Sequence, residues 1–312
     1  MLFLDCLYKT NTRLKSDHSI CEKLQIKRIA RGIIKISANT LLPMAFRITK
    51  QKKDRIGDTT LPLIVSLTSF PDRIGRVWMT IESMLRQTSK PKHIILWLSR
   101  DQFPSEECDL PKSLLKQTKR GLVIRFVDGD ARSHKKYYYA FKEYTEYCVV
   151  TIDDDLLFPS YFLESIYECS LNHPNDVIAN FGFMYIWDDE KQYLSVINNI
   201  ANTDSCKNKL FFGSGGGTLF KPSNLLAQMD DLTTILTLCP TADDVYLNAL
   251  IRISGFGVIL LQNNPLLSIV NLKDRKLSIH NGNIGNAESE NAKQIRCLTA
   301  YMKTKFGTNP LA

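Results

Sequence analysis

The chain has 312 residues, of which 44% are hydrophobic, so it can bury one large core or two modest ones, and this composition excludes a disordered protein. Its net charge of +8 is uneven, because residues 1–56 hold 13 of the 40 Lys/Arg and 4 of the 32 Asp/Glu, a balance of +9. The remaining 27 basic and 28 acidic residues make a neutral body, which argues against a nucleic-acid-binding fold.

A basic amphipathic helix is predicted over residues 23–36. At 100° per residue its basic side chains fall on one side and its apolar ones on the other, with Leu24 as an exception. The apolar side consists of Ile26, Ile29, Ala30, Ile33, Ile34 and Ile36. Such a helix suits an anionic membrane surface, where each basic residue contributes about 1 kcal/mol, and it equally suits docking of the isoleucines on the protein's own body.

The sequence contains no run of 18 apolar residues and no signal-peptide pattern at its N-terminus. We therefore expect a cytoplasmic protein that lies at most peripherally on the inner face of the cytoplasmic membrane. The eight cysteines form no C-x-x-C pair or Cys/His cluster of the kind that binds zinc.

After a polar linker, apolar strand-like runs alternate with helical patterns. The predicted order is strand 63–68, helix 76–87, strand 93–98, a helix near Leu114, strand 122–127, helix 136–147 and strand 148–152. This alternation indicates a parallel sheet covered by helices, with right-handed crossovers. The second half is less regular: helix 161–170, strand 176–181, a glycine-rich loop at 213–217, helix 243–254, strand 257–261 and a final helix.

Three consecutive aspartates, Asp153 to Asp155, follow the strand at 148–152. Carboxylates crowded at the mouth of a buried strand repel one another unless a cation neutralises them, and Mg²⁺ or Mn²⁺ prefers such oxygen ligands. The alternative is an acidic triplet that begins a loop and caps the next helix.

Polar clusters follow the other predicted strands at residues 68–73, 99–101 and 128–130. Because ligands of open parallel sheets bind beyond the carboxyl ends of the strands, these clusters and the triplet are expected to line one crevice.

Four segments, in this order, resemble bacterial nucleotide-sugar-dependent glycosyltransferases of the GT-A fold, in the family-2-like group that builds surface polysaccharides. They are VSLTSFPDRI at 65–74, the triplet with its Phe158-Pro159 tail, the glycine loop ending in LFKP at 219–222, and TADDVYL at 241–247. The resemblance implies an α/β GT-A (Rossmann-like) fold, with a mostly parallel sheet flanked by helices, over residues 57–312. Residues 1–56 would form an arm and linker, residues 57–158 the nucleotide-binding half and residues 159–312 the acceptor-binding half.

The resemblance also implies the ligands of a divalent metal, Mn²⁺ or Mg²⁺. Asp155 and Asp153 would hold it, with Asp153 also on the nucleotide side and Asp154 in support. His280 would be a further ligand, although a lone histidine in a polar loop is often a surface residue. A metal there would neutralise the charge that develops on the leaving diphosphate.

Asp243-Asp244 matches the acidic pair in which family members keep their catalytic base. We expect Asp244 to be the base and Asp243 to position it or bind the acceptor, because an adjacent carboxylate raises the pKa of its neighbour toward the working range. The alternative is a pair that caps the helix after it, and both can hold for one pair.

The remaining candidates would bind the nucleotide sugar, and each also has a structural interpretation. The glycine loop could approach the donor closely or be a flexible turn, and the basic turn at 132–136 could face an anion or only solvent. Trp187, Asp188 and Asp189 could contact the acceptor. The full predicted binding set is Thr68, Ser69, Pro71, Arg73, Asp128, Lys135, Lys136, Asp153, Asp154, Gly215, Gly216 and Gly217.

These observations predict a metal-dependent glycosyltransferase that moves a sugar from a nucleotide-diphosphate sugar to a glycan or lipid-linked acceptor. Inversion at the anomeric carbon, in polysaccharide or lipopolysaccharide biosynthesis, is the expected outcome. A sugar nucleotidyltransferase is the enzymatic alternative, and a non-catalytic carbohydrate-binding scaffold of the same fold is the other. No nucleic acid is expected as a partner.

Overall fold

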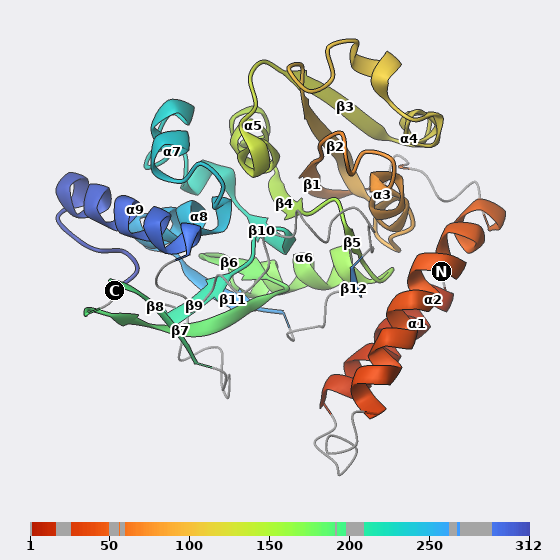
Figure 1. The fold of residues 1–312 in the computed structure, drawn as a ribbon, viewed down its shortest axis with the longest axis horizontal. Coiled ribbons are helices and arrows are strands. Elements are labelled where there is room, and N and C mark those ends of the chain that lie inside the picture. The colour runs from red at the N-terminus through yellow and green to blue at the C-terminus, as the bar shows by residue number, and fades with distance from the viewer. Residues whose placement is uncertain are drawn as a thin grey trace.

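The computed structural model describes residues 2–16, 26–49, 56, 60–190, 192–197, 209–261, 267–268 and 289–312. Within these residues a seven-stranded sheet, in the order β11-β6-β10-β4-β1-β2-β3, forms the centre of the molecule (Figure 1). Its first four strands in the chain are β1 (Leu61–Thr68), β2 (Pro91–Ser99), β3 (Leu122–Val127) and β4 (Cys148–Ile152). All pairings among these four are parallel, so their carboxyl ends meet at one edge of the sheet.

The other three strands extend the sheet beyond β4. They are β6 (Asp176–Ala179), β10 (Gly216–Phe220) and β11 (Gly257–Leu260). β10 runs antiparallel between β4 and β6, and β6 pairs in parallel with β11. The sequence analysis placed residues 216–217 in a glycine loop, because glycines weaken the pattern of a strand. In the structure these residues begin β10, all of whose residues are buried.

Helices cover both faces of the sheet. Alternate residues of β1 point to opposite layers, since Leu63, Val65 and Leu67 lie in one buried apolar cluster and Ile64 lies in the other. The first cluster includes residues of α3 (Val77–Leu85), α4 (Lys112–Thr118) and α6 (Phe162–Asn172). The second includes residues of α5 (Lys135–Glu143), α7 (Leu232–Leu238), α8 (Asp243–Ile253) and α9 (Glu290–Phe306). The predicted fold class, an α/β fold with a mostly parallel sheet flanked by helices, is confirmed.

Smaller elements complete the described chain. A three-stranded antiparallel sheet contains β7 (Gly182–Asp188), β8 (Tyr193–Ile197) and β9 (Leu210–Phe212), and β5 (Leu156–Leu157) pairs with β12 (Leu267–Ser268). Three short 3₁₀ turns are η2 (Glu106–Asp109), η3 (Arg132–His134) and η5 (Pro222–Asn224). Within the described residues the predicted helix at 136–147 ends early, at Glu143, and the other predicted strands and helices of the sheet region differ from the observed bounds by a few residues.

The N-terminal arm consists of α1 (Leu2–Ser16) and α2 (Ile26–Ile48), which lie side by side next to α3 and β5 (Figure 1). A separate apolar cluster joins them to the body through Leu4 and Tyr8 of α1, Ile34, Ala38, Leu42 and Phe46 of α2, and Met79 and Leu157 of the body. None of the helices in the described part of the chain combines the length and apolar character that a membrane crossing requires.

Hydrogen bonds fix the arm to the body at both of its ends. The Asp5 carboxylate accepts bonds from the Ser160 N–H at 2.8 Å and the Ser160 hydroxyl at 2.7 Å. The Arg86 guanidinium donates to the Phe46 carbonyl at 2.9 Å and to the Thr49 hydroxyl at 2.8 Å. The arm is therefore packed on the body by a face of α2 that includes Ile34, whereas Ile29, Ile33 and Ile36 are exposed.

Candidate functional site

The aspartate triplet lies at the carboxyl end of β4, where parallel strands place ligand sites. Its members differ in exposure: the Asp153 side chain is 47% exposed, Asp155 29% and Asp154 6%. Asp154 is the structural member, because its carboxylate accepts a hydrogen bond from the Ser69 hydroxyl at 2.5 Å and its carbonyl accepts one from Thr80 at 2.8 Å. Burial and the nearby Asp153 raise the pKa of Asp154, against the opposing effect of Arg73 and Ser69.

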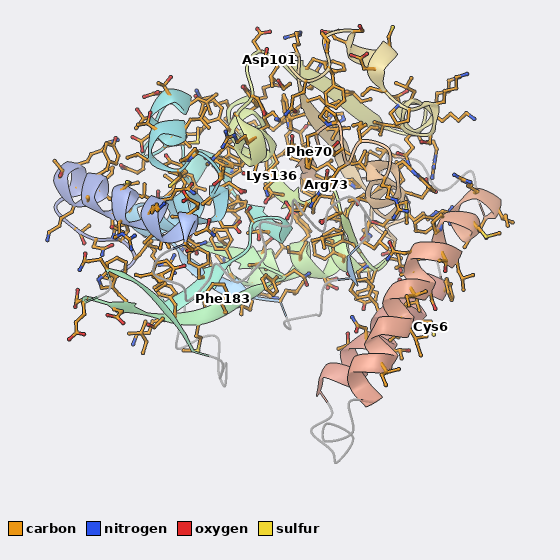
Figure 2. The ribbon with its side chains drawn as sticks, viewed as in Figure 1. Cys6, Phe70, Arg73, Asp101, Lys136 and Phe183 are labelled. Carbon is orange, nitrogen blue, oxygen red and sulfur yellow. The ribbon has the colours of Figure 1, made fainter. Side chains whose placement is uncertain are left out.

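Arg73, from the loop after β1, joins two members of the triplet. Its Nη1 lies 3.0 Å from Asp154 Oδ1 and 3.1 Å from Asp155 Oδ2. Figure 2 shows Arg73 beside Phe70, and the guanidinium carbon is 5.5 Å from the centroid of that ring. The first strand-end cluster therefore contacts the triplet, as its position after β1 indicated.

Lys136 connects the triplet to the second half of the chain. This side chain, at the start of α5, is buried, and its ammonium lies 2.8 Å from Asp153 Oδ1 and 2.9 Å from Asp243 Oδ2. Burial alone would lower the pKa of Lys136, but the charges of Asp153, Asp243 and Asp244 raise it well above its usual range. Lys136 is thus a fixed cation between two acidic groups that are far apart in the sequence.

The glycine loop holds these acidic groups together through Ser214 and the backbone carbonyl of Gly215. The Ser214 hydroxyl donates to Asp243 Oδ2 at 2.5 Å, the Ser214 N–H donates to Asp244 Oδ1 at 2.7 Å, and the Asp153 N–H donates to the Gly215 carbonyl at 2.8 Å. A Cβ on Gly215 would come within 1.9 Å of the Asp153 carboxyl group. A side chain at residue 215 would therefore displace the Asp153 carboxylate from its present position.

Asp243 and Asp244 are the first two residues of α8, and the helix cap is Ala242, whose N–H is instead bound by the Gln294 side chain at 3.0 Å. Asp243 and Asp244 therefore do not cap α8, as the alternative interpretation predicted. They lie in its first turn, where the positive end of the helix dipole favours their charge. Burial raises the pKa of Asp243, but Lys136 and the Ser214 hydroxyl outweigh it and the pKa is lowered. Burial and the charge of Asp243 raise the pKa of Asp244 to about 7.

Other predicted binding residues take different positions. The Thr68 hydroxyl donates to the Trp97 carbonyl at 2.8 Å, and Pro71 is exposed. Asp128 is 91% exposed and forms an ion pair with Arg100 at 2.8 Å. Lys135 is buried beside Asp130, and burial lowers its pKa.

Two glycines of the loop belong to the sheet. Gly216 pairs with Ile152 at the end of β4, and Gly217, with a φ of +96°, has no space for a side chain because Phe162 lies 2.6 Å from its ideal Cβ. They set the start of β10 rather than a free loop.

The other predicted site residues lie away from this cluster or outside the described residues. Trp187 Nε1–H donates a hydrogen bond to Asp189 Oδ1 at 3.0 Å. Both residues are at the far end of β7 from Gly182, and it is Gly182 that pairs with Phe212, next to the glycine loop. Arg132 is exposed in η3. His280, the predicted third metal ligand, lies outside the described residues.

Two contributing residues were missed in the sequence, Ser214 and Gln294. Ser214 is flagged only by its position between two glycines, and nothing local to Gln294 distinguishes it from other helical glutamines. Both act through contacts with α8 or the two residues before it, over 29 to 53 positions in the chain.

The described residues contain no group of three or more His, Cys, Asp or Glu side chains that could by themselves hold a metal ion. Asp153 and Asp155 nevertheless fit a hard divalent cation, because both are partly exposed carboxylates at one strand end. Mg²⁺ in particular is commonly bound by one or two carboxylates together with substrate phosphates and waters.

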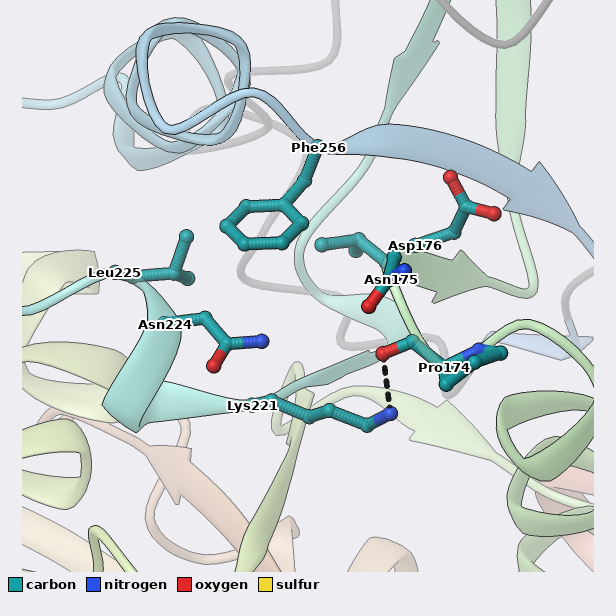
Figure 3. A pocket seen from close by; sticks show the side chains of 8 residues that line it. Pro174, Asn175, Asp176, Lys221, Asn224, Leu225 and Phe256 are labelled. Atoms are coloured by element: carbon teal, nitrogen blue, oxygen red, sulfur yellow. Dashed lines mark hydrogen bonds between the residues drawn. The ribbon is translucent and has the colours of Figure 1, made fainter.

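A cavity elsewhere in the molecule, shown in Figure 3, lies at the opposite edge of the sheet. It includes Asp176, the first residue of β6, and Lys221, which follows β10 and donates to the Pro174 carbonyl at 2.5 Å. The amino end of β6 is remote from the carboxyl end of β4, since the two strands run the same way on either side of β10. This cavity therefore takes no part in the acidic site.

No family model matches the chain, and no curated protein matches it. Among solved structures, it is similar to a mannosyltransferase from Pyrobaculum calidifontis in complex with GDP-Man and Mn²⁺, at 14% identity and a TM-score of 0.42, over 73% of this chain and 64% of that one. It is also similar to a 4-diphosphocytidyl-2C-methyl-D-erythritol synthase from Anaerococcus prevotii, at 14% identity and a TM-score of 0.39, over 71% of this chain and 97% of that one.

Proposed function

We propose that this protein is a metal-dependent glycosyltransferase that uses a nucleotide-diphosphate sugar. The observation that carries the proposal is the continuous contact from Asp153 through Lys136 to Asp243, with Asp244 beside it. A donor site and a proton acceptor would then lie next to each other at the carboxyl edge of the sheet, as transfer of a sugar to a hydroxyl requires.

In this proposal Asp153 and Asp155 hold Mn²⁺ or Mg²⁺, which neutralises the diphosphate when it is bound. Arg73 and Ser69 keep Asp154 in place, so the triplet retains its shape before any ligand arrives. The glycine loop leaves the Asp153 side chain partly exposed, which gives a phosphate-bound cation access to it. His280 stays a predicted third ligand.

Asp244 is proposed as the general base. Its raised pKa, about 7, suits a group that takes a proton from an acceptor hydroxyl near neutral pH. As that oxygen bonds to the anomeric carbon, the bond to the diphosphate breaks with its electron pair, and Asp244 keeps the proton. Attack from the opposite face inverts the anomeric configuration.

The proposed acceptor is a glycan or lipid-linked molecule, in polysaccharide or lipopolysaccharide biosynthesis on the cytoplasmic side of the membrane. A nucleotidyltransferase is less well supported, since the loop after β1 is SFPDR and lacks the glycine-rich, Lys/Arg-bearing sequence expected for that reaction. A purely structural scaffold is less well supported, since it would not require Asp153, Lys136, Asp243 and Asp244 to meet at the carboxyl end of the sheet.

The test is a panel of nucleotide sugars measured by thermal stabilisation and by release of nucleoside diphosphate, with Mn²⁺ and with EDTA. We expect one donor to stabilise the protein only with metal, and Asp155→Ala to weaken that binding roughly 10- to 100-fold. Glu143→Ala, which removes an exposed carboxylate at the other end of α5 from Lys136, is the control and should bind as the wild type does. Donor binding that ignores EDTA and Asp155→Ala would contradict the metal role, and release of pyrophosphate would indicate the nucleotidyltransferase.

A further inference from the structure

Helix α2 uses opposite faces for two different environments. One face, with Leu42 and Phe46, is buried against α1 and the body. The other carries six large apolar side chains that are 50% to 79% exposed, here called the α2 stripe: Ile29, Ile33, Ile36, Leu41, Met44 and Ile48. The isoleucines were predicted to face either the body or a membrane. In the structure Ile34 faces the body and is buried, whereas Ile33 and Ile36 are exposed.

The exposed apolar side chains of the described residues are concentrated in the α2 stripe. Six of the nine exposed large hydrophobic side chains in the described residues belong to it, and a seventh, Phe3, lies on the adjacent helix α1. From Ile29 to Ile48 it extends about 29 Å along the helix, at 1.5 Å per residue. Contiguous exposed apolar surface of this kind marks an interaction site.

The stripe cannot turn inward without breaking the arm's attachment. Leu42 and Phe46 are buried in the cluster that includes Met79 and Leu157, and the Arg86 guanidinium lies 4.9 Å from the centroid of the Phe46 ring. Tyr8 donates to the Leu157 carbonyl and adds a further constraint. The outward direction of the stripe is therefore built into the fold.

The positive charge of the arm indicates which kind of partner the α2 stripe binds. The sequence of α2 holds five basic residues, Lys27, Arg28, Arg31, Lys35 and Arg47, and no acidic residue, within an arm of net charge +9. A second copy would bring an equally charged arm against this one, which is unfavourable. A helix with an apolar face and a strongly basic sequence suits the boundary between headgroups and acyl chains of an anionic membrane.

We propose that the α2 stripe is a membrane-binding surface that lies in the interface of an anionic bilayer, with α2 parallel to it and the body held in the water beside it. Apolar burial of the stripe and attraction of the basic residues to anionic headgroups contribute together. This inference goes beyond the glycosyltransferase proposal and does not depend on it, because it concerns a surface remote in sequence from the aspartate triplet and its readout is binding.

The experiment is sedimentation of the full-length protein with vesicles of phosphatidylcholine and with vesicles of equal parts phosphatidylcholine and phosphatidylglycerol. The test variant carries Ile33→Gln and Ile36→Gln, which remove apolar surface and leave the charge unchanged. The matched control is Leu171→Gln, since Leu171 is 63% exposed on helix α6, outside the arm. Thermal unfolding midpoints verify that all three proteins are folded.

We expect the wild type and Leu171→Gln to bind the anionic vesicles, less so at high salt, and the double variant to bind at least about tenfold more weakly. Binding that the double variant retains in full would overturn the proposal. So would the absence of binding to both vesicles, or light scattering that finds a wild-type dimer and a monomeric double variant, because the stripe would then be a contact between copies.

Discussion

Two clusters of ion pairs in this molecule, each with buried members, differ in charge balance. In the first, Glu82 of α3, 1% exposed, accepts bonds from Arg86 at 2.8 Å and Arg120 at 3.1 Å. Burial would raise the pKa of Glu82, but the two guanidiniums outweigh it and lower the pKa. One carboxylate is thus paired with two guanidinium groups, and Arg86 also contacts Phe46 of α2.

In the second cluster the excess is negative. Lys136 and Arg73 contact Asp153, Asp154, Asp155 and Asp243, and Asp244 adds a fifth carboxylate next to Asp243. Three of the five, Asp153, Asp155 and Asp244, are also partly exposed. The comparison teaches that burial of an ion pair does not by itself indicate a binding site. An excess of carboxylates over cations that is partly exposed to solvent leaves a position for a further cation.

The largest expected effect is on catalysis. Asp244→Asn should lower kcat about 1000-fold, within the usual range for loss of a general base, while donor binding changes little. Steady-state kinetics with the donor found in the panel measure this, with Glu143→Gln as the control. Wild-type activity should rise with pH through about 7, where Asp244 loses its proton, and the variant should lack that rise. A variant that keeps a tenth of the activity would remove Asp244 from the role.

The next effect is on stability alone. Glu82→Gln leaves Arg86 and Arg120 without their carboxylate, and should lower the free energy of unfolding by about 3–5 kcal/mol. Urea unfolding followed by tryptophan fluorescence measures the loss, and activity per folded molecule should be unchanged. A loss of less than about 1 kcal/mol would mean that this cluster is not the structural counterpart of the acidic one.

A smaller and reversible effect is expected at Lys136. Lys136→Met removes the cation between Asp153 and Asp243, and should cost about 2 kcal/mol, less than the change at Glu82 because Asp153 is partly exposed to water. Added Mn²⁺ should restore part of the loss, since a divalent ion can replace the missing positive charge. The same addition should leave Glu82→Gln unaffected. If Mn²⁺ stabilised both variants equally, the acidic cluster would not be the specific site of the added cation.

The remaining expected effect is a pH dependence of stability. The pKa of Asp244 is raised in the folded protein, so the folded state binds the proton more tightly and stability attributable to this group falls as pH rises from about 4 to about 7. Asp244→Asn should therefore gain stability relative to the wild type across that range. Thermal unfolding at several pH values measures the difference, and a constant difference would show that the pKa of Asp244 is not raised.

Much of the fold could be predicted from local pattern. The strand at 122–127 and the helix predicted at 243–254, observed at 243–253, could be recognised because apolar spacing and side-chain propensity act over a few residues. β10 was missed because glycines at 216 and 217 carry no such signal, and only its two neighbouring strands make it part of the sheet. Ser214 and Gln294 were missed for the same reason, since their partners lie 29 or more positions away.

The sequence by itself determined that three carboxylates follow a buried strand and that a basic, isoleucine-rich helix precedes the body. Only the tertiary structure decided that Lys136, predicted to face a phosphate, is buried between Asp153 and Asp243, and that the stripe of α2 faces outward while Phe46 faces inward. The physical reason is that residue type and spacing set the local conformation, whereas charge compensation and burial depend on neighbours that only the packed chain brings together.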